Sequence, residues 1–340
     1  MASNFRMVAR QARGNAGLAG RVPRALRALR AVLLLCGLQA AGGASWSAAS
    51  AAPEATGDDL PARFEQARRQ GAAQLGRRPV YLQSTESPER LEGEVLALIE
   101  HPAPEVRAAL AQASAWCDIL ILHLNVKYCR VARSGVDVAS GDMLEVGLGR
   151  KFDEPLSKAH WLQFKFRALP PLGEAPSRPP RVELHAAQGP LDTQDIRITV
   201  QTAAVPGGRT LLQLRYAYAQ GPAARWALQL YLATVGRHKV GFTVQADRPE
   251  AGPEASGRGQ PVVGVRGLLE RNTVRYYLAV DAYLDALTLP PEQQLERRLQ
   301  DWFTATERHP AQLHELDWET YVQMKRQEVR RQQSPPPAHP

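Results

Sequence analysis

The chain has 340 residues, with 42 lysines and arginines against 34 aspartates and glutamates, and a formal net charge of +8. Residues 1–51 account for most of this excess, because they contain seven arginines and no acidic residue, which leaves 35 basic residues against 34 acidic ones. A nearly neutral remainder lacks the basic surface that binds phosphate backbones, so the composition predicts no nucleic-acid partner.

Residues 1–51 have the pattern of a signal peptide. An arginine-bearing region is followed by the apolar run AVLLLCGLQAAGGA and by Ala49-Ser50-Ala51, a small-x-small cleavage pattern. The apolar run is too short for a comfortable membrane span, so no transmembrane span is expected after signal removal. We therefore expect an exported protein, periplasmic or extracellular. An arginine-rich organelle transit peptide is the alternative.

Residues 52–80 are interpreted as a polar leader with a short helix at 60–75. The main domain is predicted to span 81–289. It begins near Val80 with VYLQSTES, and a strand at 93–101 follows. One or two helices come next, because Pro104 suits a first helical turn and Val106, Leu110, Ala113 and Cys117 fall on one face.

Two cysteines follow the predicted signal peptide, Cys117 and Cys129. An even pair in an exported chain predicts one disulfide, which would tie the end of the helical segment to the next strand. Two buried thiols on neighbouring elements are the alternative. The spacing matches neither CxxC nor a zinc-ligand pattern.

Apolar and polar residues then alternate with a period of two in a series of runs from residue 122 to residue 218. The runs are separated by turns rich in Gly, Pro, Asp and Ser. This alternation predicts an antiparallel sheet with one buried face and a hairpin turn at Pro206-Gly207-Gly208. The apolar positions are Leu122, Leu124, Val126, Tyr128, Leu144, Val146, Leu148, Leu162, Phe164, Phe166, Val182, Leu184, Ala186, Ile196, Ile198, Val200, Leu212, Leu214, Tyr216 and Tyr218.

The sequence next predicts a helix at 223–235, a strand in KVGFTVQA and a loop at 247–261. The longest predicted helix is Gly264–Leu287. Its apolar stripe is predicted to face the concave side of the sheet and consists of Tyr276, Val280, Tyr283, Leu284 and Leu287.

We predict a C-terminal helical extension at residues 290–330 and a disordered tail at residues 331–340. The extension contains two amphipathic helices, PEQQLERRLQDWFTATE and DWETYVQMKRQEVRRQQ. An envelope protein is a possible partner for these helices.

Polar and aromatic residues concentrate on the last strand and the long helix. The predicted ligand-binding residues are Arg215, Tyr216, Tyr218, Arg271, Arg275, Tyr276, Val280 and Tyr283. Tyrosine has an apolar face with one polar tip, and arginine has a fork that matches carboxylate or phosphate. An arginine near the cavity mouth would meet an anionic head group. The alternative is a structural network in which the arginines pair with acids and the tyrosines fill the core.

The segments EGEVLALIEHPAPEVRAAL…WCDIL and RGLLERNTVRYYLAVDAYL, with the strands between them, resemble the START and polyketide-cyclase-like (SRPBCC) superfamily over about residues 85–287. The resemblance implies an α+β helix-grip fold, in which a curved antiparallel sheet grips a long C-terminal helix. It also implies an apolar small molecule or lipid between sheet and helix. The helix at 223–235 and the helices after Pro290 depart from that pattern.

No GxSxG, HExxH, P-loop, GxGxxG or paired-cysteine motif occurs. We therefore predict no catalytic residue, metal site or cofactor. The sequence favours an exported carrier of a lipid or other apolar molecule, with or without an anionic head group. An envelope assembly protein without a cavity, and a cyclase or hydrolase that uses the same cavity, are the alternatives.

Overall fold

The computed structural model describes residues 60–69, 75, 80–132, 142–169, 180–221, 225, 239–245 and 259–333. The predicted signal peptide, nearly all of the predicted helix at 223–235, the tail from 334 and most of the loop at 247–261 lie outside these residues.

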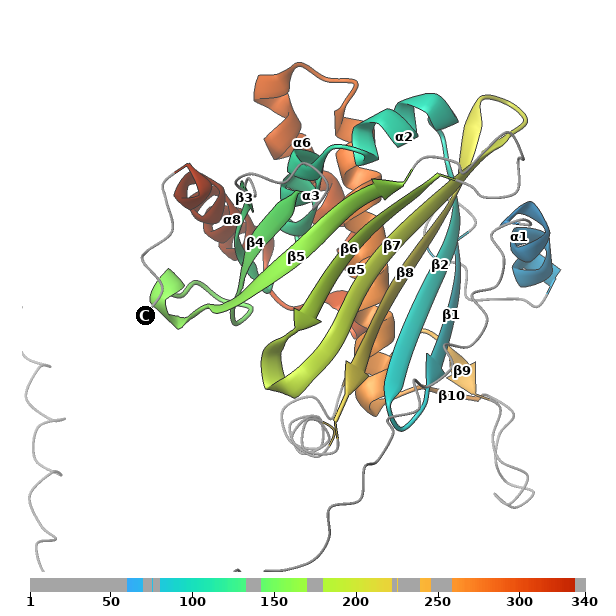
Figure 1. Ribbon diagram of the computed structural model, residues 1–340, viewed down its shortest axis with the longest axis horizontal. Helices are drawn as coiled ribbons and strands as arrows, with labels where there is room; N and C mark the ends of the chain where they lie inside the picture. The colour runs from blue at the N-terminus through green and yellow to red at the C-terminus, as the bar shows by residue number, and fades with distance from the viewer. Residues whose placement is uncertain are drawn as a thin grey trace, which may run out of the picture. The chain divides into compact units, whose positions relative to one another are not determined.

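Eight antiparallel strands form one curved sheet in the order β1-β2-β8-β7-β6-β5-β4-β3 (Figure 1). The strands are β1 (Val80–Glu86), β2 (Arg90–Ile99), β3 (Val126–Ala132), β4 (Met143–Leu148), β5 (His160–Leu169), β6 (Arg181–Gln188), β7 (Thr193–Val205) and β8 (Arg209–Gln220). A separate short hairpin pairs β9 (Val244–Gln245) with β10 (Gln260–Pro261).

The β7–β8 hairpin turns where the sequence predicts it. Gly207 and Gly208 both have positive φ, at 86° and 69°. A tight turn that matches the twist of its strands needs such angles, and glycine adopts them without a steric penalty.

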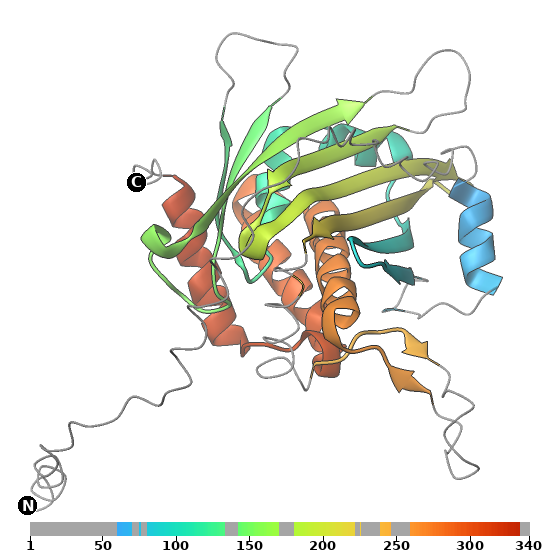
Figure 2. The same ribbon diagram turned by 60° about the horizontal axis from the view of Figure 1, so that its bottom comes forward.

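Three helices lie on the concave face of the sheet: α2 (Ala103–Leu110), α3 (Ala113–Leu120) and α5 (Gly264–Ala286). Figure 2 shows α5 running beneath the strands, and it packs against β1, β2 and β8. A Cβ at Gly93 of β2 would collide with the Thr273 side chain of α5, so this strand glycine allows the close approach. The protein is therefore an α+β helix-grip protein, as predicted.

The opposite face is partly covered by α1 (Leu60–Arg69), which corrects the expectation of a sheet with only one buried face. Leu60 and Phe64 of α1 pack on Tyr81, Leu96 and Leu211 of the β1–β2–β8 edge. The ring centroids of Phe64 and Tyr81 are 5.1 Å apart.

The C-terminal extension consists of α6 (Pro291–Glu307), α7 (Pro310–Leu313) and α8 (Trp318–Gln332). Leu299 and Trp302 of α6 and Tyr321 of α8 are fully buried, and the rings of Trp302 and Tyr321 stack at 5.1 Å. The Trp302 indole N–H donates to the Arg275 carbonyl of α5 at 3.1 Å. The apolar faces of α6 and α8 are thus occupied by the chain itself.

Cys117 and Cys129 form the predicted disulfide between α3 and β3, with a Cα–Cα distance of 5.1 Å. The strand predicted from Leu122 begins only at Val126, because residues 121–125 form a turn. The β3–β4 register then shifts between Val126 and Tyr128, which leaves Lys127 in a β-bulge.

None of the helices in the described residues is long and apolar enough to cross a membrane.

Candidate functional site

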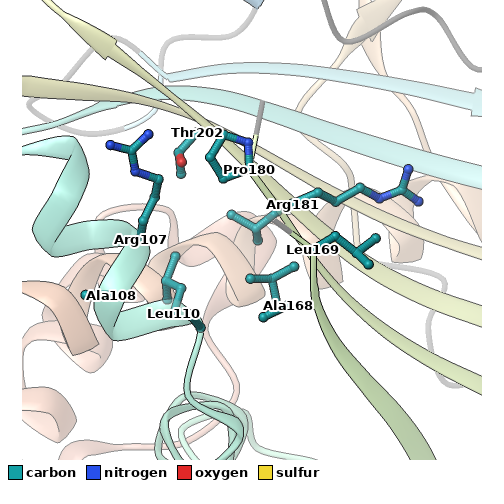
Figure 3. Close-up of a pocket in the computed structure, with 11 residues that line it drawn as sticks. Arg107, Ala108, Leu110, Ala168, Leu169, Pro180, Arg181 and Thr202 are labelled. Carbon is teal, nitrogen blue, oxygen red and sulfur yellow. The ribbon is translucent and has the colours of Figure 1, made fainter. Parts of the chain in front are cut away.

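A pocket of about 550 Å³ lies between the last turn of α2 and the ends of β5, β6 and β7 (Figure 3). We call it the outer pocket. Its walls are mostly apolar and include Leu110, Val182 and Val200, and its lining residue Leu169 is 43% exposed. Small-molecule sites typically enclose about 300–1,000 Å³. The outer pocket is large enough for such a ligand.

One buried hydroxyl in the outer pocket has no partner. Thr202 of β7 is 4% exposed, and its Oγ1 makes no hydrogen bond within the described residues. A buried hydroxyl without a partner costs about 1–3 kcal/mol. A polar atom of a ligand would remove that cost.

Two arginines border the same pocket. Arg107 of α2 is half-buried, and no ion-pair partner for it occurs in the described part of the chain. Arg181 of β6 instead pairs with Glu183 at 2.7 Å, and Figure 3 shows it extending away from Arg107. Arg107 is therefore the cation that is available to an anionic group at this site.

A second, smaller space of about 160 Å³ lies farther along the concave face, under the N-terminal half of α5. We call it the inner cavity. It is lined by Tyr216 and Tyr218 of β8, by Asn272 and Tyr276 of α5, and by apolar residues of the neighbouring strands. An apolar cavity of roughly 150 Å³ accepts a molecule the size of benzene. The inner cavity alone suits a single ring or a short alkyl chain.

The inner-cavity tyrosines are neutral. Burial raises the pKa of Tyr276 to about 12, and burial also raises the pKa of Tyr216 and Tyr218 above the usual value. Their rings contact one another, with 5.1 Å between the centroids of Tyr216 and Tyr276. Phenols with raised pKa values are poor bases at neutral pH, so these residues act as apolar walls with hydroxyl tips.

A row of three side chains separates the two spaces. Phe166 pairs with Leu184 and Leu184 pairs with Ile198 across β5, β6 and β7, and all three are buried. On β5, Phe164 lines the inner cavity and Ala168 the outer pocket, four residues or about 13 Å apart. We call Phe166, Leu184 and Ile198 the partition row.

Three of the eight predicted ligand-binding residues therefore come together around one cavity, namely Tyr216, Tyr218 and Tyr276. Whether they contact a ligand stays a prediction. The sequence analysis missed Thr202 and Arg107. The signal for Thr202 was available, since it is a polar residue that continues the inward positions Ile196, Ile198 and Val200.

Arg215 lies on the opposite face of the sheet, which corrects its expected position beside the tyrosines. It neighbours Tyr216 in sequence, and successive strand residues point to opposite faces. Its Nε donates to Glu94 at 2.7 Å, and Arg63 of α1 reaches the same carboxylate.

The two helix arginines are not at a cavity mouth. Arg275 is 1% exposed and pairs with Glu315 at 2.9 Å, and Arg271 is 3% exposed and donates to the Val240 carbonyl at 3.2 Å. The segment between α7 and α8 meets Arg275 through Glu315, and the segment before α5 meets Arg271 through Val240. The structural-network alternative thus describes their positions.

Val280 and Tyr283 line neither space. Val280 is fully buried in the core, and the Tyr283 ring lies 5.6 Å from the Arg298 guanidinium of α6. Leu287, expected on the same stripe, is 40% exposed. The residues of α5 that border the inner cavity are Leu268, Asn272 and Tyr276. Of the predicted stripe only Tyr276 lines the cavity, because the other stripe residues lie farther toward the C-terminal end of α5.

Glu270 of α5 is fully buried, and its carboxylate is already bonded. It accepts from the Phe242 and Thr243 amides at 2.7 and 2.9 Å and from the Ser84 and Thr243 hydroxyls. Within the described ranges, no three His, Cys, Asp or Glu side chains are grouped to hold a metal ion.

No family model and no curated protein matches the chain. Among solved structures, truncated norcoclaurine synthase from Thalictrum flavum is 11% identical, with a TM-score of 0.31 over 45% of this chain and 89% of that one. Ara h 8.0201 is 10% identical, with a TM-score of 0.32 over 58% and 99%. These values mark a distant likeness, so the helix-grip assignment rests on this chain's own strand order and long helix.

Proposed function

We propose that this protein binds and carries an apolar molecule that has an anionic or hydrogen-bonding group, and that the outer pocket is its principal site. The observation that carries the proposal is an apolar pocket of about 550 Å³ that contains the unpartnered hydroxyl of Thr202. Apolar walls with a few polar groups are the usual composition of a ligand site. Arg107 supplies the cation for an anionic group.

Anilinonaphthalene sulfonate tests this proposal, because it combines apolar rings with one anion. Its fluorescence should rise on binding to the full chain. Thr202→Val keeps the side-chain shape and removes the hydroxyl, and Arg107→Gln removes the cation. Each loss of a hydrogen bond, charge-assisted for Arg107, should weaken binding by about 1–2 kcal/mol, which is roughly five- to thirtyfold.

Two variants serve as matched controls. Thr199→Val changes the same residue type on the other face of β7, and Arg167→Gln removes an exposed arginine of β5 that does not line the pocket. Both should leave the affinity unchanged. Equal affinity in Thr202→Val, Arg107→Gln and the two controls would refute the outer pocket as the site.

The partition row predicts a limit on ligand length. Competition with fatty acids of increasing chain length should show a preference for short chains in the parent protein. Phe166→Ala should join the two spaces and shift that preference toward longer chains. The substitution also costs about 3–5 kcal/mol of stability, so circular dichroism should first confirm that the variant is folded. An unchanged chain-length profile in the folded variant would contradict the role of the partition row as the barrier between the two spaces.

We also propose that the protein acts outside the cytoplasm. The arginine-bearing N-terminal segment with its apolar run supports export, and the Cys117–Cys129 disulfide is compatible with an oxidising compartment. N-terminal sequencing of protein from its native host should find a start near Ala52. A chain that retains Met1 or Met7 would contradict export.

A further inference from the structure

Three cations surround one carboxylate at the junction of α5 with the C-terminal extension. Glu315, between α7 and α8, pairs with Arg275 at 2.9 Å, with Lys151 at 2.5 Å and with Lys239 at 3.6 Å. We call these four residues the open cluster. Its formal charge is +2.

The cations of the open cluster differ in their access to water. The Arg275 side chain is 1% exposed, whereas the side chains of Lys151 and Lys239 are 31% and 29% exposed. An incoming solute would therefore meet the two lysines first. Each ammonium has three N–H donors. Lys239 also donates to the His314 carbonyl at 2.5 Å, and the single carboxylate cannot satisfy all of the remaining donors.

One donor of the open cluster is buried without a partner. Arg275 donates through Nη2 to Glu315 and to the Leu313 carbonyl, but its Nε has no hydrogen-bond partner within the described residues. Buried charged groups are normally fully hydrogen-bonded. The open cluster thus has an excess of positive charge and one buried donor without an acceptor.

Electrostatic effects on the titratable groups agree with this geometry. Burial would raise the pKa of Glu315, but the charges of Lys151, Arg275 and Lys239 hold it below the usual value. Burial lowers the pKa of Lys151 to about 8, and the neighbouring Arg275 acts in the same direction, against Glu315. Excess positive charge is therefore present even with Glu315 ionised.

We propose that the open cluster is a binding site for a multiply charged oxyanion of the phosphate type, separate from both apolar spaces. A dianion would neutralise the formal charge of +2 and supply acceptors to the Lys151 and Lys239 ammonium groups. Such an oxyanion comes either from free phosphate or from a phosphate-bearing lipid head group. A bound anion would also bridge α5 and the segment before α8.

Inorganic phosphate is the probe for the first experiment. Calorimetric titration of the full chain should show binding of phosphate beyond the effect of chloride at equal ionic strength. Lys151→Gln and Lys239→Gln should each weaken phosphate binding about tenfold or more, because each removes a charge-assisted hydrogen bond. Lys158→Gln, an exposed lysine on the neighbouring η5 turn (Leu156–Lys158), should change nothing.

Glu315→Gln provides an independent test. This variant leaves Arg275 buried without its carboxylate, so phosphate should raise its melting temperature more than that of the parent protein. If this variant does not fold, the lysine variants still test the site. Equal melting shifts with chloride and phosphate in the parent, or an equal loss of binding in Lys158→Gln, would overturn the proposal.

Vesicles distinguish the two sources of the oxyanion. Cosedimentation with phosphatidic acid vesicles, but not with phosphatidylcholine vesicles, and its loss in Lys151→Gln would assign a lipid head group. Phosphate binding without cosedimentation would assign a soluble anion. Binding of neither free phosphate nor phosphatidic acid would refute the site.

Discussion

Two groups of charged side chains fasten the C-terminal helices to the domain, and they differ in their access to water. The open cluster pairs Glu315 with the buried Arg275 and with Lys151 and Lys239, whose side chains are 31% and 29% exposed. The second group, which we call the closed cluster, consists of Lys127 of β3 with Lys325 and Glu328 of α8, and all three side chains are 0% exposed.

The closed cluster is completed by the protein itself. Glu328 accepts from Lys127 at 2.9 Å and from Lys325 at 2.7 Å. Lys325 also donates to the His123 and Val126 carbonyls at 2.7 and 3.0 Å. Each Lys325 proton therefore has an acceptor. The comparison shows that an excess of cations marks a candidate ligand site only where donors remain unsatisfied and water can reach them.

His123 lies beside both clusters and stays neutral, chiefly because it is buried and further because cations of both clusters are near it. Burial lowers its pKa well below the usual value, and the charges of Arg275 and Lys325 lower it further. Its Nδ1 accepts from the Asn125 amide at 3.2 Å, and its ring stacks on Tyr276 at 5.1 Å. A third positive charge at this position is thereby avoided.

The largest expected effect is that of Glu328→Gln. It leaves Lys127 and Lys325 buried without a counter-charge, so the free energy of unfolding should fall by about 3–5 kcal/mol. Urea unfolding followed by tryptophan fluorescence measures the change. Glu319→Gln, which changes an exposed glutamate on the same helix, should cost far less. Similar losses of stability in both variants would contradict the prediction that the buried charge of Glu328 matters more than an exposed one.

Glu315→Gln should cost less than Glu328→Gln, about 2 kcal/mol, because Lys151 and Lys239 can turn to water and only Arg275 stays buried. Thermal unfolding in phosphate-free buffer measures this difference. A loss as large as that of Glu328→Gln would mean that the open cluster is as sealed as the closed one.

The next expected effect is on the pH dependence of stability, to which each cluster contributes one lysine. Burial, assisted by the charge of Lys127 and opposed by Glu328, lowers the pKa of Lys325 to about 8. The pKa of Lys151, which faces Arg275, Lys239 and Glu315, is also lowered to about 8. Above pH 8 the unfolded chain, whose lysines have their ordinary pKa, binds more protons than the folded chain. The free energy of unfolding should therefore rise with pH.

Between pH 8 and 9.5 that rise is at most about 1.4 kcal/mol per pH unit for each lysine. Lys325→Met should remove the contribution of the closed cluster. Phosphate should reduce only the contribution of Lys151, because a bound anion favours its charged form. Denaturant titrations at several pH values check this, and a phosphate effect that disappears in Lys325→Met would contradict the assignment.

The smallest expected effect is that of Gln332→Ala. The Gln332 Oε1 accepts from the Cys129 backbone N–H of the edge strand β3 at 3.0 Å. Losing one such hydrogen bond should cost about 1 kcal/mol. Hydrogen exchange should show faster exchange of the Cys129 amide, without a change at β7 and β8.

The sequence predicted the elements of this fold well. Helices α6 and α8 lie where their amphipathic patterns place them, and the alternation correctly assigned Phe166, Ile198 and Tyr216 to the inward face. Alternation reports which side chains share a face, because strand geometry has a period of two. It does not report what covers the other face, which is why the contacts of α1 and α8 were missed.

The site was predicted only in part. Tyr216, Tyr218 and Tyr276 line the inner cavity, yet the larger outer pocket was not foreseen. A cavity volume depends on how many side chains fail to fill a space, and no single residue carries that information.

By itself, the sequence determined the order of strands and helices, the cysteine pair and the near-neutral domain, since these follow from local periodicity and composition. Only the tertiary structure decided the role of each charge. Arg275 meets Glu315 forty residues away, and the β3 bulge brings Lys127 to Glu328 of α8. Such pairs form between elements distant in sequence, so their partners and their exposure become defined only when those elements pack.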